Sequence, residues 1–284
     1  MTEFSKQSIW RARHERHLFG SKFAALVLND ANQLSRYIEL TLVLTKKEIK
    51  VRYKSYLLGY VWSIANPLAF AFVFYVVFQV IMKIQIENYV IFLISGLFPW
   101  QWFSNSVNTS TATFLGNASL IKKIKFPRSS VVLAVVLQDA AHFALSLPVV
   151  AVFLLAYGKS PALAWLWGIP ILMFVQLLLT FGAALFLATV NLFFRDMERL
   201  VAVIMVFVFY FTPVLYSENL IPDKFVGFLT LHPVAPLIIS WRSLLLNGVM
   251  NFEYVKIALV HAAAIFFIGY WVYRKLSWRF AEVL

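Results

Sequence analysis

The sequence predicts an all-α integral membrane protein with six transmembrane helices, an amphipathic N-terminal helix at the membrane interface and an outer re-entrant helical segment before the last span. Two observations predict this fold class. The 284 residues are 61% hydrophobic and 13% charged, whereas a soluble domain has about 45–50% apolar and about 25% charged residues. The apolar residues also gather in runs long enough to cross a hydrocarbon core of about 30 Å as helices.

The chain is expected to begin with a basic cytoplasmic tail, residues 1–31, followed by the interface helix, residues 32–56. Apolar residues recur near helical spacing in that helix, at Leu34, Ile38, Leu42 and Ile49. Basic residues mark its polar side, at Lys46, Lys47 and Lys50. Such a helix suits the membrane interface, and it serves either as a simple lipid anchor or as a scaffold for a cytoplasmic partner.

The membrane domain is expected to cover residues 57–284. Six apolar runs in it approach spanning length, at about 57–82, 89–114, 131–157, 164–190, 200–216 and 254–273. Residues 218–250 are also apolar, but they contain Arg242 and two prolines, which a seventh span would place at membrane depth. Irregular backbone at that depth is tolerated where protein or a water-filled cavity shields it, so the sequence predicts a re-entrant segment on the outer side.

The net charge of +12 is distributed unevenly between the two sides of this topology. Twenty of the 25 Lys and Arg residues fall on the side that carries both termini. The positive-inside rule therefore places both termini in the cytoplasm, and the basic excess needs no nucleic-acid partner. The chain has no cysteine, which excludes disulfides, thiolate nucleophiles and cysteine-based metal sites.

The sequence offers little for catalysis. Gly158-Lys159-Ser160 lacks the upstream glycine and the preceding strand of a phosphate-binding loop, and the five scattered histidines predict no metal site. Asp139 and His142 lie inside the third expected span. They could form a proton relay, contact substrate or make an interhelical hydrogen bond, and the last is favoured because no other span supplies a second carboxylate.

Aromatic residues are abundant, with 28 Phe, 12 Tyr and 9 Trp. Their flat, weakly polar faces suit sliding sugar rings, although aromatic side chains in membranes more often pack or face lipid. The candidates for a substrate channel lie in the first and fifth expected spans, at Tyr60, Phe70, Phe74, Phe78, Phe207, Tyr210, Phe211 and Tyr216.

The cytoplasmic loop between the second and third expected spans combines cations with apolar residues. Its candidate partner-contacting residues are Lys122, Lys123, Lys125, Phe126, Pro127 and Arg128. A loop that only orients the protein needs the charges but not the Ile-Phe-Pro pattern, so this loop is the strongest candidate for docking another protein.

From residue 32 to the end, the chain resembles the membrane subunits of ABC-2 type polysaccharide exporters, such as those that export O-antigen, capsule or teichoic acid. The matching motifs are Lys50–Lys54, Leu97–Trp100, Leu120–Arg128, Phe194–Asp196, Thr212–Ser217, Ile221-Pro222 and His232-Pro233 with Pro236–Ile238. That family usually has Asn where His232 stands. Each motif alone is weak, but their order and spacing together are specific.

The resemblance implies a homodimer in the bacterial cytoplasmic (inner) membrane, with two separate ATP-binding cassette subunits. ATP and Mg²⁺ would bind those subunits, leaving this chain without cofactor or enzymatic activity. The interface helix, with Lys46, Lys47 and Lys50, and the 122–128 loop would dock on the ATPase. The first and fifth spans of two copies would enclose a path for a lipid-linked polysaccharide, which the re-entrant segment would close at the outer side.

Three alternatives remain at this point. An ABC-2 exporter of a small lipid or drug would need a smaller pocket and no continuous aromatic lining. A membrane-embedded glycosyl- or acyltransferase would need paired carboxylates or a His-Asp pair at a membrane face, for which only Asp139 and His142 come close. A simple channel would conduct without nucleotide.

Overall fold

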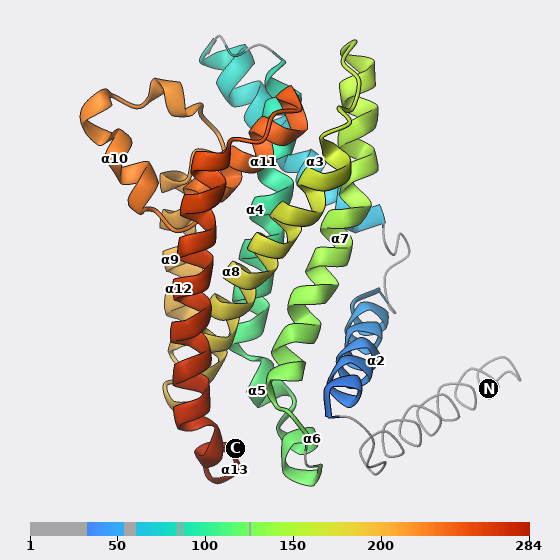
Figure 1. Cartoon of the computed structure of the whole chain (residues 1–284), viewed down its shortest axis with the longest axis vertical. Helices are drawn as coiled ribbons and strands as arrows, with labels where there is room; N and C mark the ends of the chain where they lie inside the picture. The colour runs from blue at the N-terminus through green and yellow to red at the C-terminus, as the bar shows by residue number, and fades with distance from the viewer. Residues whose placement is uncertain (1–32, 54–60, 84–85, 87, 125) are drawn as a thin grey trace, which may run out of the picture.

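The computed structural model describes residues 33–53, 61–83, 86, 88–124 and 126–284. Every regular element in this described part is a helix, which confirms the all-α prediction. Long helices form a bundle along the long axis of the molecule (Figure 1): α4 (Tyr89–Thr111), α7 (Ser129–Ala156), α8 (Trp165–Phe193), α9 (Met197–Phe211) and α12 (Phe252–Leu276).

The first expected span is visible from Val61 onward. Helix α3 (Val61–Phe74) passes directly into a π-helical stretch, η1 (Tyr75–Ile81). Residues 57–60, including Tyr60, lie outside the described residues. Beyond α4, two short helices, α5 (Thr113–Gly116) and α6 (Ala118–Lys123), lead into α7.

Within the described ranges, three helices are long and apolar enough to cross a membrane: α7, α8, and α12 with its continuation η3 (Ser277–Arg279). The pair α10 (Asp223–Leu231) and α11 (Ala235–Asn247) would make a fourth span if counted as one, but the two helices meet at 93°. The bend follows the His232-Pro233 turn, because the residue before a proline is driven out of the helical conformation. This bent pair lies within the segment for which the sequence predicts a re-entrant fold.

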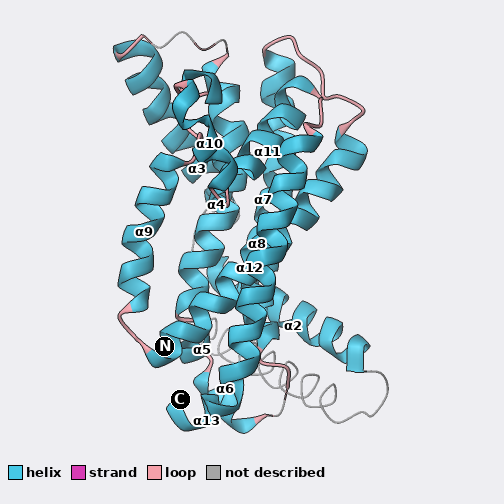
Figure 2. Cartoon of the chain, turned by 60° about the vertical axis from the view of Figure 1, so that its left-hand side comes forward, coloured by secondary structure: helices cyan, strands magenta, loops and turns pink. Residues whose placement is uncertain are grey.

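The connections separate into two ends (Figures 1 and 2). The lower end holds α6, the α8–α9 turn, η3 and the C-terminal helix α13 (Phe280–Val283), with α2 (Gln33–Tyr53) beside the lower half of α7. The upper end holds α10, α11 and the connections α3–α4 and α7–α8. The short helix η2 (Glu218–Leu220) lies between α9 and α10.

Two contacts set the packing of the bundle. Gly182 of α8 and Gly269 of α12 meet backbone to backbone, since a Cβ on Gly269 would collide with the carbonyl oxygen of Gly182. Gln176 of α8 joins two other helices, because its Nε2 donates to the Pro99 carbonyl (2.7 Å) and its Oε1 accepts from the Trp241 indole. Small residues and side-chain hydrogen bonds hold membrane helices together in this way, because lipid offers no hydrophobic drive between them.

Candidate functional site

The lower end brings α2 and the 115–130 loop into one packed unit. Leu40 and Leu44 of α2 are buried against Ala134 of α7. Leu120, Ile124 and Phe126 of the loop pack onto the same cluster. Some of the apolar side chains of the loop therefore pack inside the subunit, where they hold α2 against the start of α7.

The other apolar face of α2 stays open. Ile38 and Leu42, two members of the predicted stripe, are each 50% exposed. Lys46 and Lys50 are exposed as well. Helix α2 thus has one apolar face that packs inside the protein and a second, with basic neighbours, that faces its surroundings.

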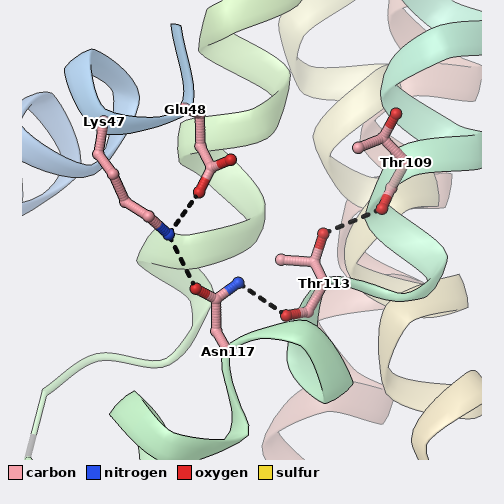
Figure 3. A network of polar contacts seen from close by, with 5 residues as sticks. All are labelled: Lys47, Glu48, Thr109, Thr113 and Asn117. Atoms are coloured by element: carbon pink, nitrogen blue, oxygen red, sulfur yellow. Dashed lines mark hydrogen bonds and ion pairs between the residues drawn. The ribbon is translucent and has the colours of Figure 1, made fainter. Parts of the chain in front are cut away.

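Lys47 links α2 to the end of α4 through a chain of polar contacts (Figure 3). Its Nζ lies 2.9 Å from Glu48 Oε1 and donates to Asn117 Oδ1 at 3.2 Å. Asn117 Nδ2 in turn donates to the Thr113 carbonyl at 2.9 Å, and Thr113 Oγ1 donates to the Thr109 carbonyl at 3.1 Å. These contacts connect α2, through Asn117 and α5, to the lower end of α4.

The end of the loop is fixed to the C-terminal segment. Arg128 donates to the Ser277 carbonyl, and its guanidinium lies 5.6 Å from the centre of the Phe280 ring. The Ser129 amide donates to the Tyr273 hydroxyl at 3.1 Å. Tyr37 of α2 shares a 3.5 Å hydroxyl contact with Ser129, and burial raises the pKa of its phenol, which keeps that hydroxyl protonated.

Only part of the predicted docking set faces outward. Lys122, Lys123 and Pro127 are exposed, whereas Phe126 and Arg128 are partly covered by the contacts above. Lys125 lies outside the described residues. The sequence does not single out Asn117 or Tyr273. Their contact partners lie 70 and 144 residues away along the chain, and no local pattern indicates such distant contacts.

The aromatic candidates divide into two groups. Phe70, Phe207, Tyr210 and Phe211 are between 51% and 59% exposed. Phe74 and Phe78 pack inward instead: the Phe74 ring centre lies 6.0 Å from that of Phe209, and the Phe78 ring centre lies 6.4 Å from that of Tyr89. Phe74 and Phe78 therefore join α3 and η1 to α9 and α4, whereas the rings of the first group remain at the surface of the subunit.

Helix α9 is the least covered of the long helices in the bundle. Of its residues only Val201 and Met205 are buried. Beyond its first turn, which exposes Glu198 and Arg199, its open face is apolar, with exposed Val203, Ile204, Val206, Phe207, Tyr210 and Phe211. Figure 2 shows α9 at the edge of the bundle. Tyr216, just beyond this helix, is half-buried, and its hydroxyl donates to the carbonyls of Tyr210 (3.3 Å) and Phe211 (3.2 Å).

The intramembrane carboxylate lies in a contact between two helices. Asp139 of α7 is 3% exposed, and its Oδ2 accepts a hydrogen bond of 2.9 Å from Ser106 Oγ of α4. His142 lies one turn further along α7 and is half-buried. In the described part of the chain, no three histidines or carboxylates gather where a metal ion could bind.

His232 takes over a capping role at the bend between α10 and α11. Its Nδ1 accepts the backbone amides of Val234 (3.2 Å) and Ala235 (3.1 Å) at the start of α11. An asparagine carbonyl oxygen caps helix starts in the same manner. His232 therefore caps the start of α11 through its ring nitrogen, a role that an asparagine side chain can also fill.

Comparisons with known proteins bear on the family of the chain. Residues 39–246 match the model of the family described as ABC-2 type transporter. The chain is 46% identical over 251 residues to an O-antigen export system permease protein of Klebsiella pneumoniae, which covers 88% of this chain and 97% of the relative. It is 32% identical over 217 residues to the protein of the same name from Myxococcus xanthus, covering 75% and 82%.

A more distant relative is named for the transport of a different polysaccharide. The chain is 24% identical over 219 residues to a polysialic acid transport protein of Escherichia coli, covering 72% of this chain and 80% of that protein.

Proposed function

The chain belongs to the ABC-2 type transporter family, and we propose that it is the permease subunit of an ATP-driven exporter for a lipid-linked, O-antigen-like polysaccharide. The observation that carries this proposal is the 46% identity to an O-antigen export permease across 97% of that relative. A permease subunit of this kind has no ATPase site of its own, because ATP hydrolysis, with its Mg²⁺, occurs in a separate subunit. The protein is an integral protein of the bacterial inner membrane.

The proposed topology has six spans. Helix α3 with η1, α4, α7, α8, α9 and α12 each cross once, and the bent pair α10–α11 enters and leaves on the outer side. Helices α4 and α9 lie alongside the three apolar spanning helices (Figure 1), which supports their assignment. Helix α9 has 15 residues, about 22 Å at 1.5 Å per residue, and the 212–216 segment extends it.

Both termini are proposed to be cytoplasmic. The lower end of the molecule carries the C-terminus, α2 and the basic residues of the 122–128 loop. In this arrangement residues 1–31 form a cytoplasmic tail, residues 32–56 the interface helix and residues 57–284 the transmembrane domain. The open face of α2, with Ile38 and Leu42 beside Lys46 and Lys50, suits the boundary between acyl chains and anionic headgroups.

The lower unit is the proposed docking surface for the ATP-binding subunit. Exposed Lys122 and Lys123 would contact the partner. Phe126, Arg128 and Lys47 would then pass its movement to α7, α12 and α4 through the contacts described above. ATP binding and hydrolysis would thus shift the population between two arrangements of the helices.

The transport path is proposed to lie between two copies of this chain, served by two ATP-binding subunits. The open faces of α9 and α3 are available for this contact, since they are apolar and carry exposed aromatic rings, and either lipid or a second copy would cover them in the membrane. Phe70, Phe207, Tyr210 and Phe211 would present their rings to the passing sugars, and Tyr60 would join them at the start of the first span.

Reconstitution of the permease with its ATP-binding partner in proteoliposomes tests the proposed function. Lipid-linked polysaccharide added to the inner leaflet should become accessible to an external lectin only when ATP is present. A partner variant unable to hydrolyse ATP is the control and should abolish this exposure. Hydrolysis of ATP by the permease alone, or polymer exposure without ATP, would contradict the assignment.

A further inference from the structure

Arg242 of α11 is a buried cation in the upper half of the molecule. It is 5% exposed, and its guanidinium carbon lies 3.7 Å from the centre of the Phe92 ring of α4. Gly96, one turn further along α4, makes room for it, because a Cβ there would come within 2.9 Å of Arg242 Nη2. A buried charge costs free energy unless partners compensate it, so the contacts of this guanidinium indicate its role.

Both polar partners of Arg242 lie on one segment, residues 212–218, which joins α9 to the outer helices. Its Nη2 donates to the Val214 carbonyl at 2.9 Å, and its Nη1 lies 3.8 Å from Glu218 Oε2. Tyr89 of α4 holds the same segment beside it, because its hydroxyl donates to the Leu215 carbonyl at 2.9 Å. The segment is buried where it is held, with Val214 0% and Leu215 5% exposed.

This segment anchors a helix that is otherwise weakly held. The side of α9 that faces the bundle contributes only two buried residues. Its lower end is fixed by Asn191, whose Oδ1 accepts the Glu198 amide at 3.0 Å and whose Nδ2 donates to the Thr111 carbonyl at 2.9 Å. Its upper end continues directly into the residues that Arg242 and Tyr89 hold. The two ends of α9 are therefore held by hydrogen bonds, and Phe209 packs its middle against Phe74 and Trp100.

We propose that Arg242 is a positioning residue that clamps the 212–218 segment onto α11 and α4 and thereby fixes the outer end of α9, the wall of the proposed channel. The side chain of Glu218 is 30% exposed, so water can reach its ion pair with Arg242. We expect this ion pair to break before the buried hydrogen bond to the Val214 carbonyl. Release of the clamp frees the upper end of α9 while the lower end stays attached. The transport role of the clamp rests on the proposed function, but its structural role does not.

Thiol labelling tests the clamp directly, because the chain has no cysteine of its own. The thiol introduced by Val214→Cys is buried in the clamped segment and should react slowly with a maleimide in the purified full-length protein. Arg242→Gln should raise its labelling rate about ten- to a hundredfold, since hydrogen bonds to a charged group are lost. Arg242→Lys keeps the positive charge but cannot reach the Val214 carbonyl and Glu218 with two separate nitrogens. The labelling rate of Val214→Cys in this variant should therefore lie between the other two rates.

A second buried thiol separates local release from general loosening. Leu172→Cys lies in α8 at a position that is 0% exposed. Its labelling rate should not change when Arg242→Gln is added. If Arg242→Gln raises the labelling rates of both thiols equally, or leaves the rate of Val214→Cys unchanged, the clamp is refuted.

Two milder variants keep the test decisive if Arg242→Gln fails to fold. Tyr89→Phe removes only the hydrogen bond to the Leu215 carbonyl. Glu218→Gln removes only the negative charge that faces Arg242. Each should raise the Val214→Cys rate several-fold. The matched control is Glu253→Gln, which removes a carboxylate that forms no ion pair with Arg242 in the described residues and should leave the rate unchanged.

The transport consequence is measured in the reconstituted complex. Arg242→Gln should retain ATP hydrolysis but export several-fold less polymer per ATP, because the channel wall no longer moves with the lower unit. Loss of hydrolysis and export in equal proportion would refute the positioning role in transport. If no variant of the complex exports polymer but the thiol results hold, the proposed function fails and the clamp stands.

Discussion

At the scale of single residues, the contacts that hold the bundle use groups whose importance a sequence shows poorly. Gly182 and Gly269 are 87 positions apart, and only the structure shows that their backbones touch. The same holds for Gln176, which satisfies a carbonyl of α4 and an indole of α11. Asp139 and Arg242 could be recognised from the sequence because a charged residue within an apolar run is rare, but their partners could not.

The backbone contact between Gly182 and Gly269 leads to a direct prediction. Gly269→Ala should destabilise the protein by about 1–3 kcal/mol, because the added methyl group must push α12 away from α8. The measurement is thermal unfolding of the purified protein in detergent, where the midpoint should fall by several degrees. Gly182→Ala should act in the same direction, since its Cβ would lie 2.5 Å from the Phe266 Cα.

Gly227→Ala is the matched control for this prediction. A Cβ on Gly227 of α10 meets nothing within 4 Å, so the substitution should be neutral or stabilising by up to about 1 kcal/mol. Equal effects at Gly227 and Gly269 would show that the crossing is not tightly packed.

At the scale of elements, hydropathy located the helices of the bundle to within a few residues. The third expected span, 131–157, corresponds to Ser129–Ala156, and the fourth, 164–190, to Trp165–Phe193. The fifth, 200–216, ends earlier, because Pro213 cannot continue the hydrogen bonding of α9 beyond Phe211. The π-helical stretch and the choice of which face of α2 packs inward depend on tertiary contacts and could not be predicted.

The lower unit formed by α2 and the 115–130 loop should bind its partner through the exposed lysines. Lys122→Ala with Lys123→Ala should weaken binding of the ATP-binding subunit about three- to tenfold, since each exposed charge contributes roughly 0.2–1 kcal/mol. The remaining affinity should depend less on salt, because exposed charges act over distances that ions screen. Titration of the partner against permease in detergent at two salt concentrations measures both effects.

Lys159→Ala provides the control for the docking prediction. Lys159 is also exposed but lies between α7 and α8, at the opposite end of the molecule. If its loss weakens binding as much as the loss of Lys122 and Lys123, the docking surface is not where we propose it.

At the scale of the whole molecule, the open face of α9 predicts how two copies meet. Phe207→Cys should be joined into a dimer in membranes by a bis-maleimide long enough to cross the proposed sugar path, because the residue is 59% exposed on that face and the chain has no competing cysteine. Denaturing electrophoresis detects the product. The first and fifth spans could be proposed as the contact from the family resemblance, whereas their exposure is visible only in the folded subunit.

The control thiol for the dimer lies on another helix. Val152 of α7 is 64% exposed, and Figure 1 shows α7 on the other side of the bundle from α9. Val152→Cys should remain monomeric with the same cross-linker. Cross-linking of Val152→Cys but not of Phe207→Cys would place the dimer contact on the wrong face.

The backbone contact between α8 and α12 also decides which parts of the molecule can move. Two helices whose main chains touch cannot slide or separate without losing that contact, so we expect α8 and α12 to move as one rigid unit. Helix α9 has only two buried residues, and we expect it to shift against that unit more easily. A nucleotide-driven partner at the lower end would then displace α9 rather than deform the α8–α12 pair.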